Sequence, residues 1–412
     1  DAETRELLGR YRNYVKQILA LTGTKAEKLD AEATQVIDLE TRIAQASRPL
    51  LDLGNPLANY VPVATKDLAK PYKNLQLDAF LKAQGVNDDT VSLANPALFA
   101  QLNTLITGIK PDQWKTYLRY QVGNAMAPYL SHGFRDAEQQ FRGVVFRNEA
   151  AAPPRWQQVL DAINTAAGPM LGHEYTARYL PAASKQRADA IAQEVQQALD
   201  AGVQASTWMS TTAKAEAHAK ISAMKIEIGA PARDLDYTIQ PMGRGSFGSN
   251  MLIASTWRHN QEMKRIGKGN ADRRWNVLPQ SPALGYDPAQ NRIVITAAML
   301  QAPVLDMSQP NGALYGSFGA LTARAMVRAI DVHGQQIDAK GALRSWWAPT
   351  DISAWNDRLA RMGNQANGWA WPGLTGKMVN GQLVRDQSLL DLAGLDAAWR
   401  ALGKGQAVAA AD

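Results

Sequence analysis

Few side chains in this sequence of 412 residues could hold a transition metal or act as a covalent nucleophile. It contains no cysteine, which excludes a disulfide scaffold, an iron–sulfur cluster and a cysteine nucleophile. A His-Glu pair at 173–174 starts a zinc-like pattern, but no second histidine follows, so we expect an ordinary helix surface there. No two histidines are close enough in sequence to indicate a local metal site. The histidines are His132, His173, His218, His259 and His333.

Composition and charge narrow the class of protein. The sequence has 44 Lys and Arg against 38 Asp and Glu, a net charge of +6, and acids alternate with bases along the helical stretches. Nucleic-acid-binding proteins concentrate basic residues in a stripe, so we expect no nucleic-acid partner. A hydrophobic fraction of 46% is typical of a globular chain. No apolar run reaches the roughly 18–20 residues of a membrane span, so we expect a soluble chain without a transmembrane segment.

The spacing of apolar residues divides the sequence near residue 225. Residues 1–225 show helical spacing in most stretches, as in Tyr14, Val15, Ile18 and Leu19. Residues 226–412 begin with short β-branched runs that indicate strands. We therefore expect a mainly α fold with a smaller α+β part, in two domains. Within the second domain, we expect one helix at about 312–332 and another at about 386–402.

One stretch of the second domain resembles the zinc-binding helix of the neprilysin family of metalloendopeptidases. Residues 314–331 read LYGSFGALTARAMVRAID, and the similarity continues through 333–347 and 379–383. It covers nearly the whole chain, beginning after the family's N-terminal segment and stopping before its C-terminal catalytic segment. Further matching stretches are Tyr117–Tyr120, Ala127–Leu130, Trp208–Ser210 and Ile293–Pro303.

This resemblance implies a neprilysin-like two-domain architecture. Residues 1–225 would form the large helical domain that covers the substrate chamber in active relatives. Residues 226–412 would form a thermolysin-like α+β domain, the remnant of the family's catalytic domain.

The family binds zinc through a His-Glu-x-x-His helix and a glutamate from the following helix, with an aspartate that supports the first histidine. By resemblance, Arg324 and Arg328 occupy the two histidine positions, and Ala325 occupies the position of the catalytic glutamate. Gln387 stands at the third ligand position, while the supporting carboxylate is retained as Asp391. A guanidinium is always charged and has no lone pair to donate to a metal. We therefore predict a degenerate site without zinc or another cofactor.

The family's substrate-binding edge strand is altered as well. Its Asn-Ala-aromatic-Tyr pattern aligns with Ala283, Leu284, Gly285 and Tyr286, so the asparagine that holds substrate backbone is replaced by Ala283. The resemblance thus implies weakened positioning of a peptide.

Retained acids suggest what fills the old site. Arg328 and Asp331 are three residues apart, and Asp391 is expected to face Arg324. Our hypothesis is that arginine–carboxylate pairs cross-brace the two helices. The rival interpretation is that the arginine pair receives an anion or a peptide carboxylate.

Five tryptophans lie close together in sequence near the C-terminus. Trp346 and Trp347 match core positions of the family, so packing is expected for them. Trp369 and Trp371 lie in a Gly- and Asn-rich stretch, which makes them the better candidates for an exposed contact. The fifth is Trp355.

Two functions follow from the resemblance. The first is a non-catalytic pseudopeptidase, not an enzyme, that binds a peptide or protein as a regulatory or scaffold subunit, with an active homologue as one natural partner. The alternative is an active metalloendopeptidase with a relocated or partner-supplied metal, for which His333, Asp331 and Asp338 are the local ligands. Bacterial members of the family are exported, so a periplasmic or secreted location is expected.

Overall fold

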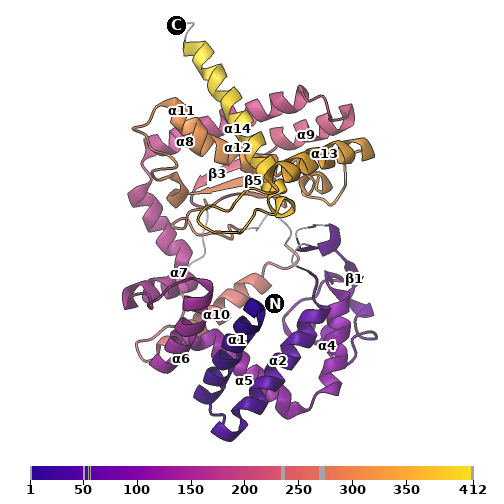
Figure 1. The fold of residues 1–412 in the computed structure, drawn as a ribbon, viewed down its shortest axis with the longest axis vertical. Coiled ribbons are helices and arrows are strands. Elements are labelled where there is room, and N and C mark those ends of the chain that lie inside the picture. Colours follow the sequence, from indigo (N-terminus) through magenta and orange to yellow (C-terminus); the bar gives the residue numbers. More distant parts are fainter. Residues whose placement is uncertain are drawn as a thin grey trace. The chain divides into compact units, whose positions relative to one another are not determined.

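The structure is a computed structural model that describes residues 2–49, 52–53, 55, 57–232, 237–268 and 274–409. The chain divides into two compact units (Figure 1). Unit 1 comprises residues 1–167 and 236–268, and unit 2 comprises residues 168–235 and 269–412.

Unit 1 is built from helices around a core that the sequence spacing predicted. Tyr14, Val15, Ile18 and Leu19 form the buried stripe of α1 and pack with Tyr120 of α5. The only strands described in unit 1 are β1 (Pro62–Ala64) and β2 (Thr90–Ser92), which pair antiparallel. The helices are α1 (Ala2–Leu21), α2 (Leu29–Ala46), α3 (Leu77–Ala83), α4 (Pro96–Gly108), α5 (Pro111–Met126), α6 (His132–Glu138), a π-helix (Gln139–Phe146) and α10 (Phe247–Met263).

Helix α7 (Arg155–Tyr179) is kinked at Ala167, where the sequence passes from unit 1 to unit 2. Ala167 has non-helical dihedral angles, and Pro169 follows within the helix. Proline lacks an amide hydrogen and its ring clashes with the carbonyl four residues before it, so a kink is expected at this point. The carbonyl oxygen of Thr165 instead accepts a hydrogen bond from Arg258 at 3.0 Å.

Unit 2 contains a three-stranded sheet in the order β3-β5-β4. Strand β3 (Lys225–Gly229) runs parallel to β5 (Arg292–Thr296), and β4 (Leu284–Asp287) runs antiparallel to β5. Every residue of the central strand β5 is buried. Ile293, Val294 and Ile295 are apolar, and Arg292 is buried because it pairs with Glu227 and Asp287.

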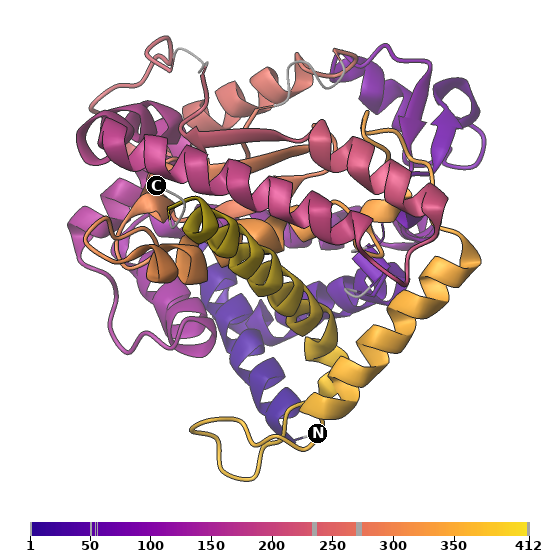
Figure 2. The ribbon, with the colours of Figure 1, turned by 90° about the horizontal axis from the view of Figure 1, so that it is seen from above.

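Helices of unit 2 pack around one core that includes this sheet. Helix α14 contacts α12, α13 and α8, and Figure 2 shows α13 and α14 converging where the segment between them begins. The helices are α8 (Ala182–Gln204), α9 (Thr211–Ser222), α11 (Asn311–Leu314), a π-helix (Tyr315–Gly319), α12 (Ala320–Val327), α13 (Pro349–Ala366) and α14 (Gly381–Ala409).

The architecture agrees with the expected mainly α fold and smaller α+β part, but the units divide at a different residue. Residues 168–225 were expected in the helical domain and belong to unit 2. The reason is the packing of α8, whose buried Ile191 and Val195 lie in the same core as Phe318 and Met326. The helix expected at about 312–332 is interrupted by the π-helix, and the helix expected at about 386–402 begins at Gly381.

Candidate functional site

Helices α12 and α14 lie side by side and present the residues identified from the sequence. Ala323 and Met326 of α12 face the core, as do Leu390 and Ala398 of α14. This orientation leaves Arg324 of α12 and Arg328 directly after its end, four residues apart and partly exposed, on the outer side of the pair.

Arg324 bridges the two helices. Its Nε lies 2.5 Å from Oδ1 of Asp391, and its guanidinium also donates to the amide oxygen of Gln387. The side chain of Arg324 is 36% exposed and that of Asp391 59% exposed, so solvent screens the ion pair. The contact expected between Arg324 and Asp391 is present, and Gln387 joins it.

Arg328 pairs within its own segment. Its Nη1 donates to Oδ2 of Asp331 at 3.1 Å. The other carboxylate oxygen of Asp331 accepts from the main-chain N–H groups of His333 and Gly334, at 2.9 and 2.8 Å. Asp331 is buried and therefore holds the turn that follows α12.

A buried lysine supports the same turn. Lys220 of α9 is 1% exposed, and its ammonium donates to the carbonyl oxygens of Gly334 and Ile337 at 2.7 and 2.5 Å. Desolvation lowers the pKa of Lys220 to about 8, while the charges of Asp331 and Asp338 act in the opposite direction. Sequence reasoning missed this residue, although Lys220 lies three residues after the buried Ala217 on the apolar face of α9.

The strand aligned with the family's edge strand is β4. Ala283 directly precedes this strand. Its carbonyl oxygen accepts a hydrogen bond from the main-chain N–H of Thr296 at 3.0 Å. Among the described residues β4 pairs with β5 alone, so its other edge has no strand partner. Helix α12, which carries Arg324, contacts β4 within the same unit. Tyr286 is partly buried, and this burial raises its pKa.

The residues of the α12–α14 pair do not fit a zinc ion. Arg324 and Arg328 offer no lone pair, Ala325 offers a methyl group, and the oxygen of Gln387 is engaged by Arg324. Over the described ranges, no three His, Asp or Glu side chains converge as a metal site.

The local ligands considered for a relocated metal are not brought together either. Asp331 faces Arg328, and Asp338 lies 3.5 Å from Arg344. The Nδ1 atom of His333 is buried and has no hydrogen-bond partner among the residues that the structure describes.

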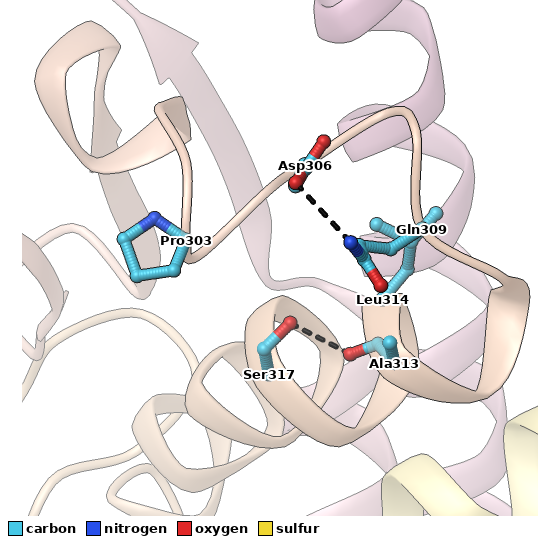
Figure 3. A pocket seen from close by; sticks show the side chains of 6 residues that line it. All are labelled: Pro303, Asp306, Gln309, Ala313, Leu314 and Ser317. Carbon is cyan, nitrogen blue, oxygen red and sulfur yellow. Dashed lines mark hydrogen bonds between the residues drawn. The ribbon is translucent and has the colours of Figure 1, made fainter.

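A cavity of about 240 Å³ opens at the other end of this helical segment (Figure 3). The hydroxyl of Ser317 donates to the carbonyl oxygens of Ala313 and Val304, at 2.7 and 2.9 Å. Asp306 accepts from Ser308 and Gln309. These polar groups satisfy one another, so the cavity lining displays little reactive chemistry. The lining residues are Pro303, Asp306, Gln309, Ala313, Leu314 and Ser317.

The chain matches two family models, both described as peptidase family M13, over residues 1–231 and 285–411. Neprilysin-3 of Drosophila melanogaster is 24% identical over 96% of the chain, and endothelin-converting enzyme 1 of Bos taurus is 25% identical over 97%. The matched regions are 52% and 54% of those proteins, so the chain spans about half the length of these relatives.

Solved structures share the fold. The zinc metalloprotease Zmp1 of Mycobacterium tuberculosis, in complex with an inhibitor, superposes with a TM-score of 0.91 at 22% identity, covering 98% of this chain and 62% of that one. PepO of Lactobacillus rhamnosis gives 0.87 at 23% identity, covering 97% of this chain and 63% of that one. The expected neprilysin-like architecture is thereby confirmed.

The prediction that the chain is not an enzyme is wrong. Both family models are those of peptidases, and the relatives are named as a neprilysin and a converting enzyme. The prediction relied on four positions of one helix pair and on Ala283 in the edge strand, in a chain that spans about half the length of these relatives.

No helix in the described parts combines the length and hydropathy needed to traverse a bilayer.

Proposed function

Because this chain belongs to peptidase family M13, we propose that it binds peptides and serves in their hydrolysis as a metalloendopeptidase whose metal is held away from Arg324 and Arg328. The observation that carries the proposal is the match of residues 285–411 to the peptidase model, because this region contains β4, α12 and α14. The metal would be relocated within the protein or supplied by a partner chain.

The donor chemistry of the helix pair supports this placement. Zinc requires neutral imidazoles or anions, and two guanidiniums four residues apart repel a dication. Arg324 also contacts Asp391 and Gln387, so freeing either acceptor for a metal would remove one of the two partners of the guanidinium. Ligands from other elements or another polypeptide avoid this conflict.

The open edge of β4 is the element we propose for peptide binding. In an antiparallel pair, hydrogen-bonded and non-bonded residue pairs alternate. Since Ala283 and Thr296 form a hydrogen-bonded pair, the main-chain N–H and C=O groups of Leu284 and Tyr286 point away from β5, toward the open edge of β4. An extended peptide can pair with such an edge through its own backbone, in β-augmentation. Ala283 provides no side-chain amide to help, so main-chain hydrogen bonds would provide most of the affinity.

The partner we propose is a protein of the same family, and the location is periplasmic or secreted. An active homologue would supply the metal-binding side chains that α12 and α14 lack. An oxidising compartment agrees with a sequence without cysteine, because no thiol is present to be oxidised there.

The test combines metal analysis with a peptide-cleavage assay. The protein is purified from its native source together with whatever chain accompanies it, and zinc content and cleavage of a fluorogenic peptide are measured with and without a chelator. We expect chelator-sensitive cleavage in the isolated protein or in its complex. An Arg324→Ala, Arg328→Ala variant serves as the control, with metal content expected to be unchanged. Absence of both metal and cleavage in the isolated protein and in the complex would contradict the proposal.

A further inference from the structure

The segment between α13 and α14 is exposed along its whole length. All twelve residues from 367 to 378 are exposed, and Figure 2 shows this part of the chain looping out past the ends of the two helices. Four of them are large and apolar: Trp369 is 57% exposed, Trp371 46%, Leu374 56% and Met378 58%. A globular surface seldom displays so many large apolar side chains within ten residues, and such patches mark interaction sites.

The segment has a defined backbone shape. The main-chain N–H of Val379 donates to the Trp369 carbonyl at 2.7 Å, and that of Trp371 donates to the Lys377 carbonyl at 3.0 Å. Gly373 and Gly376 have positive φ angles of 78° and 73°, which glycine adopts without strain. The turn therefore displays its apolar side chains to solvent instead of folding them onto the core.

The base of the segment is fixed as well. The side-chain oxygen of Asn367 accepts from the main-chain N–H of Gly381 at 2.8 Å. A Cβ at Gly381 would lie 2.0 Å from the carbonyl oxygen of Gly363, so the end of α13 and the start of α14 are in close contact. The apolar turn is held on a tight two-helix stem.

The turn lies in a basic stretch of the sequence, which Asp357 and Asp386 border. Residues 358–385 include four basic residues and no aspartate or glutamate. Arg361 and Lys377 of this set are exposed. A surface that combines exposed tryptophans and aliphatic side chains with basic residues complements an anionic lipid surface, because indole rings favour the headgroup region and basic side chains are attracted to acidic lipids.

We propose that the segment 367–378 is a membrane-surface contact that inserts Trp369, Trp371 and Leu374 among the headgroups of an anionic bilayer. This contact is independent of the proposed peptidase activity, and it would hold the protein at a membrane through a turn. A lipid surface fits better than a protein partner because the apolar side chains stand on a projecting turn and not in a groove of fixed shape. The basic residues of this stretch can be attracted to a diffuse negative surface and do not require a partner with matched acidic side chains.

The experiment measures binding of the full chain to vesicles. Sedimentation with vesicles of phosphatidylcholine and phosphatidylglycerol in a 3:1 ratio is compared with vesicles of phosphatidylcholine alone. We expect binding to the anionic vesicles and at least tenfold weaker partitioning of a Trp369→Ser, Trp371→Ser, Leu374→Ser variant. Lys377→Gln should weaken binding to the anionic vesicles severalfold and leave binding to the neutral ones unchanged.

Trp399→Ser is the matched control, because Trp399 of α14 is 73% exposed and lies outside the segment. It should bind vesicles like the wild type. Hydrogen exchange of the wild-type protein gives a second measurement that needs no variant: vesicles should slow exchange in the peptide containing 367–378. Failure of the wild type to bind anionic vesicles, triple-variant binding within twofold of wild type, or protection confined to other peptides would overturn the proposal. Loss of a co-purifying protein in the triple variant without loss of vesicle binding would assign the segment to a protein partner instead.

Discussion

Gly394 of α14 lies against the main chain of Arg324 in α12. A Cβ at position 394 would come 2.7 Å from the amide nitrogen of Arg324 and 2.8 Å from the carbonyl oxygen of Ala320. Only glycine therefore allows the two helices to approach this closely. The close approach lets the Arg324 side chain reach both Asp391 and Gln387, which lie one and two turns earlier on α14.

Gly394→Ala should destabilise unit 2 by about 1–3 kcal/mol, because the added methyl group meets backbone atoms that cannot rotate away. Urea unfolding followed by tryptophan fluorescence measures the loss. Gly403→Ala on the same helix is the control: nothing lies within 4 Å of a Cβ there, so alanine should be neutral or stabilise by up to about 1 kcal/mol. Equal effects of the two substitutions would show that the helices separate at little cost.

A zinc site can be created between these helices. The variant Arg324→His, Ala325→Glu, Arg328→His, Gln387→Glu places two imidazoles four residues apart and a carboxylate on the facing helix, where Arg324 now contacts Gln387. We expect it to bind about one zinc ion per chain by elemental analysis after dialysis. The same variant with Gln387 unchanged loses one ligand and should bind zinc at least tenfold more weakly. A quadruple variant that takes up no zinc would mean that the helix spacing differs from that of a metal site.

The lowered pKa of Lys220 predicts how the stability of the folded protein depends on pH. Its pKa in the folded protein is about 8, below the value of 10.5 expected for an unfolded chain, so the unfolded state binds more protons between these two values. The contribution of Lys220 to stability should therefore rise as pH increases from about 8 to about 10.5, by on the order of 3 kcal/mol, and should be constant below pH 8.

The measurement compares wild type with Lys220→Met by urea unfolding at several pH values, because other groups titrate in the same range. Lys225→Met is the control, since Lys225 is exposed at the start of β3. The difference between wild type and Lys220→Met should grow across this window, and the difference for Lys225→Met should stay flat. A flat difference for both would show that Lys220 titrates as it does in water.

The contact between Arg324 and Asp391 could be predicted from the sequence because it depends on two helices of known pairing and on side chains long enough to meet. The burial of Lys220 was detectable too: residues 217, 220, 221 and 224 follow helical spacing and are all buried. Reading lysine as a solvated residue concealed this stripe. The spacing of apolar residues indicates which face of a helix is buried. A single lysine on that face, such as Lys220, does not change this.

The division into units could not be obtained in this way. The change of period near residue 225 marks the start of β3, but an amphipathic helix does not show which core it covers. Helix α8 precedes the sheet in sequence and packs in the same core as β5. The break lies at the kink of α7, whose sequence signal is the pair Gly168 and Pro169. Helices α10 and α13 also escaped prediction, although Trp355, Leu359 and Ala366 of α13 are buried at helical spacing.

The start of α13 shows how one carboxylate can order two helices, and it gives a direct test of unit 2. Asp351 is fully buried, and it accepts hydrogen bonds from the main-chain N–H and the hydroxyl of Ser210, at 2.6 and 2.8 Å, and from the N–H of Ala348 at 2.9 Å. Ser210 is the N-cap of α9 and Ala348 that of α13, so the carboxylate satisfies free amides at both helix starts.

Asp351→Ala should cost about 2–4 kcal/mol of unfolding free energy, because it removes a charged acceptor from three partly buried donors. Asp351→Asn keeps one oxygen and should lose roughly half as much. Asp357→Ala, at an exposed position of the same helix, should change stability by less than about 0.5 kcal/mol. Thermal and urea unfolding of the three variants distinguish these outcomes. If Asp351→Ala matched Asp357→Ala, water would have to enter and replace the carboxylate at both helix starts.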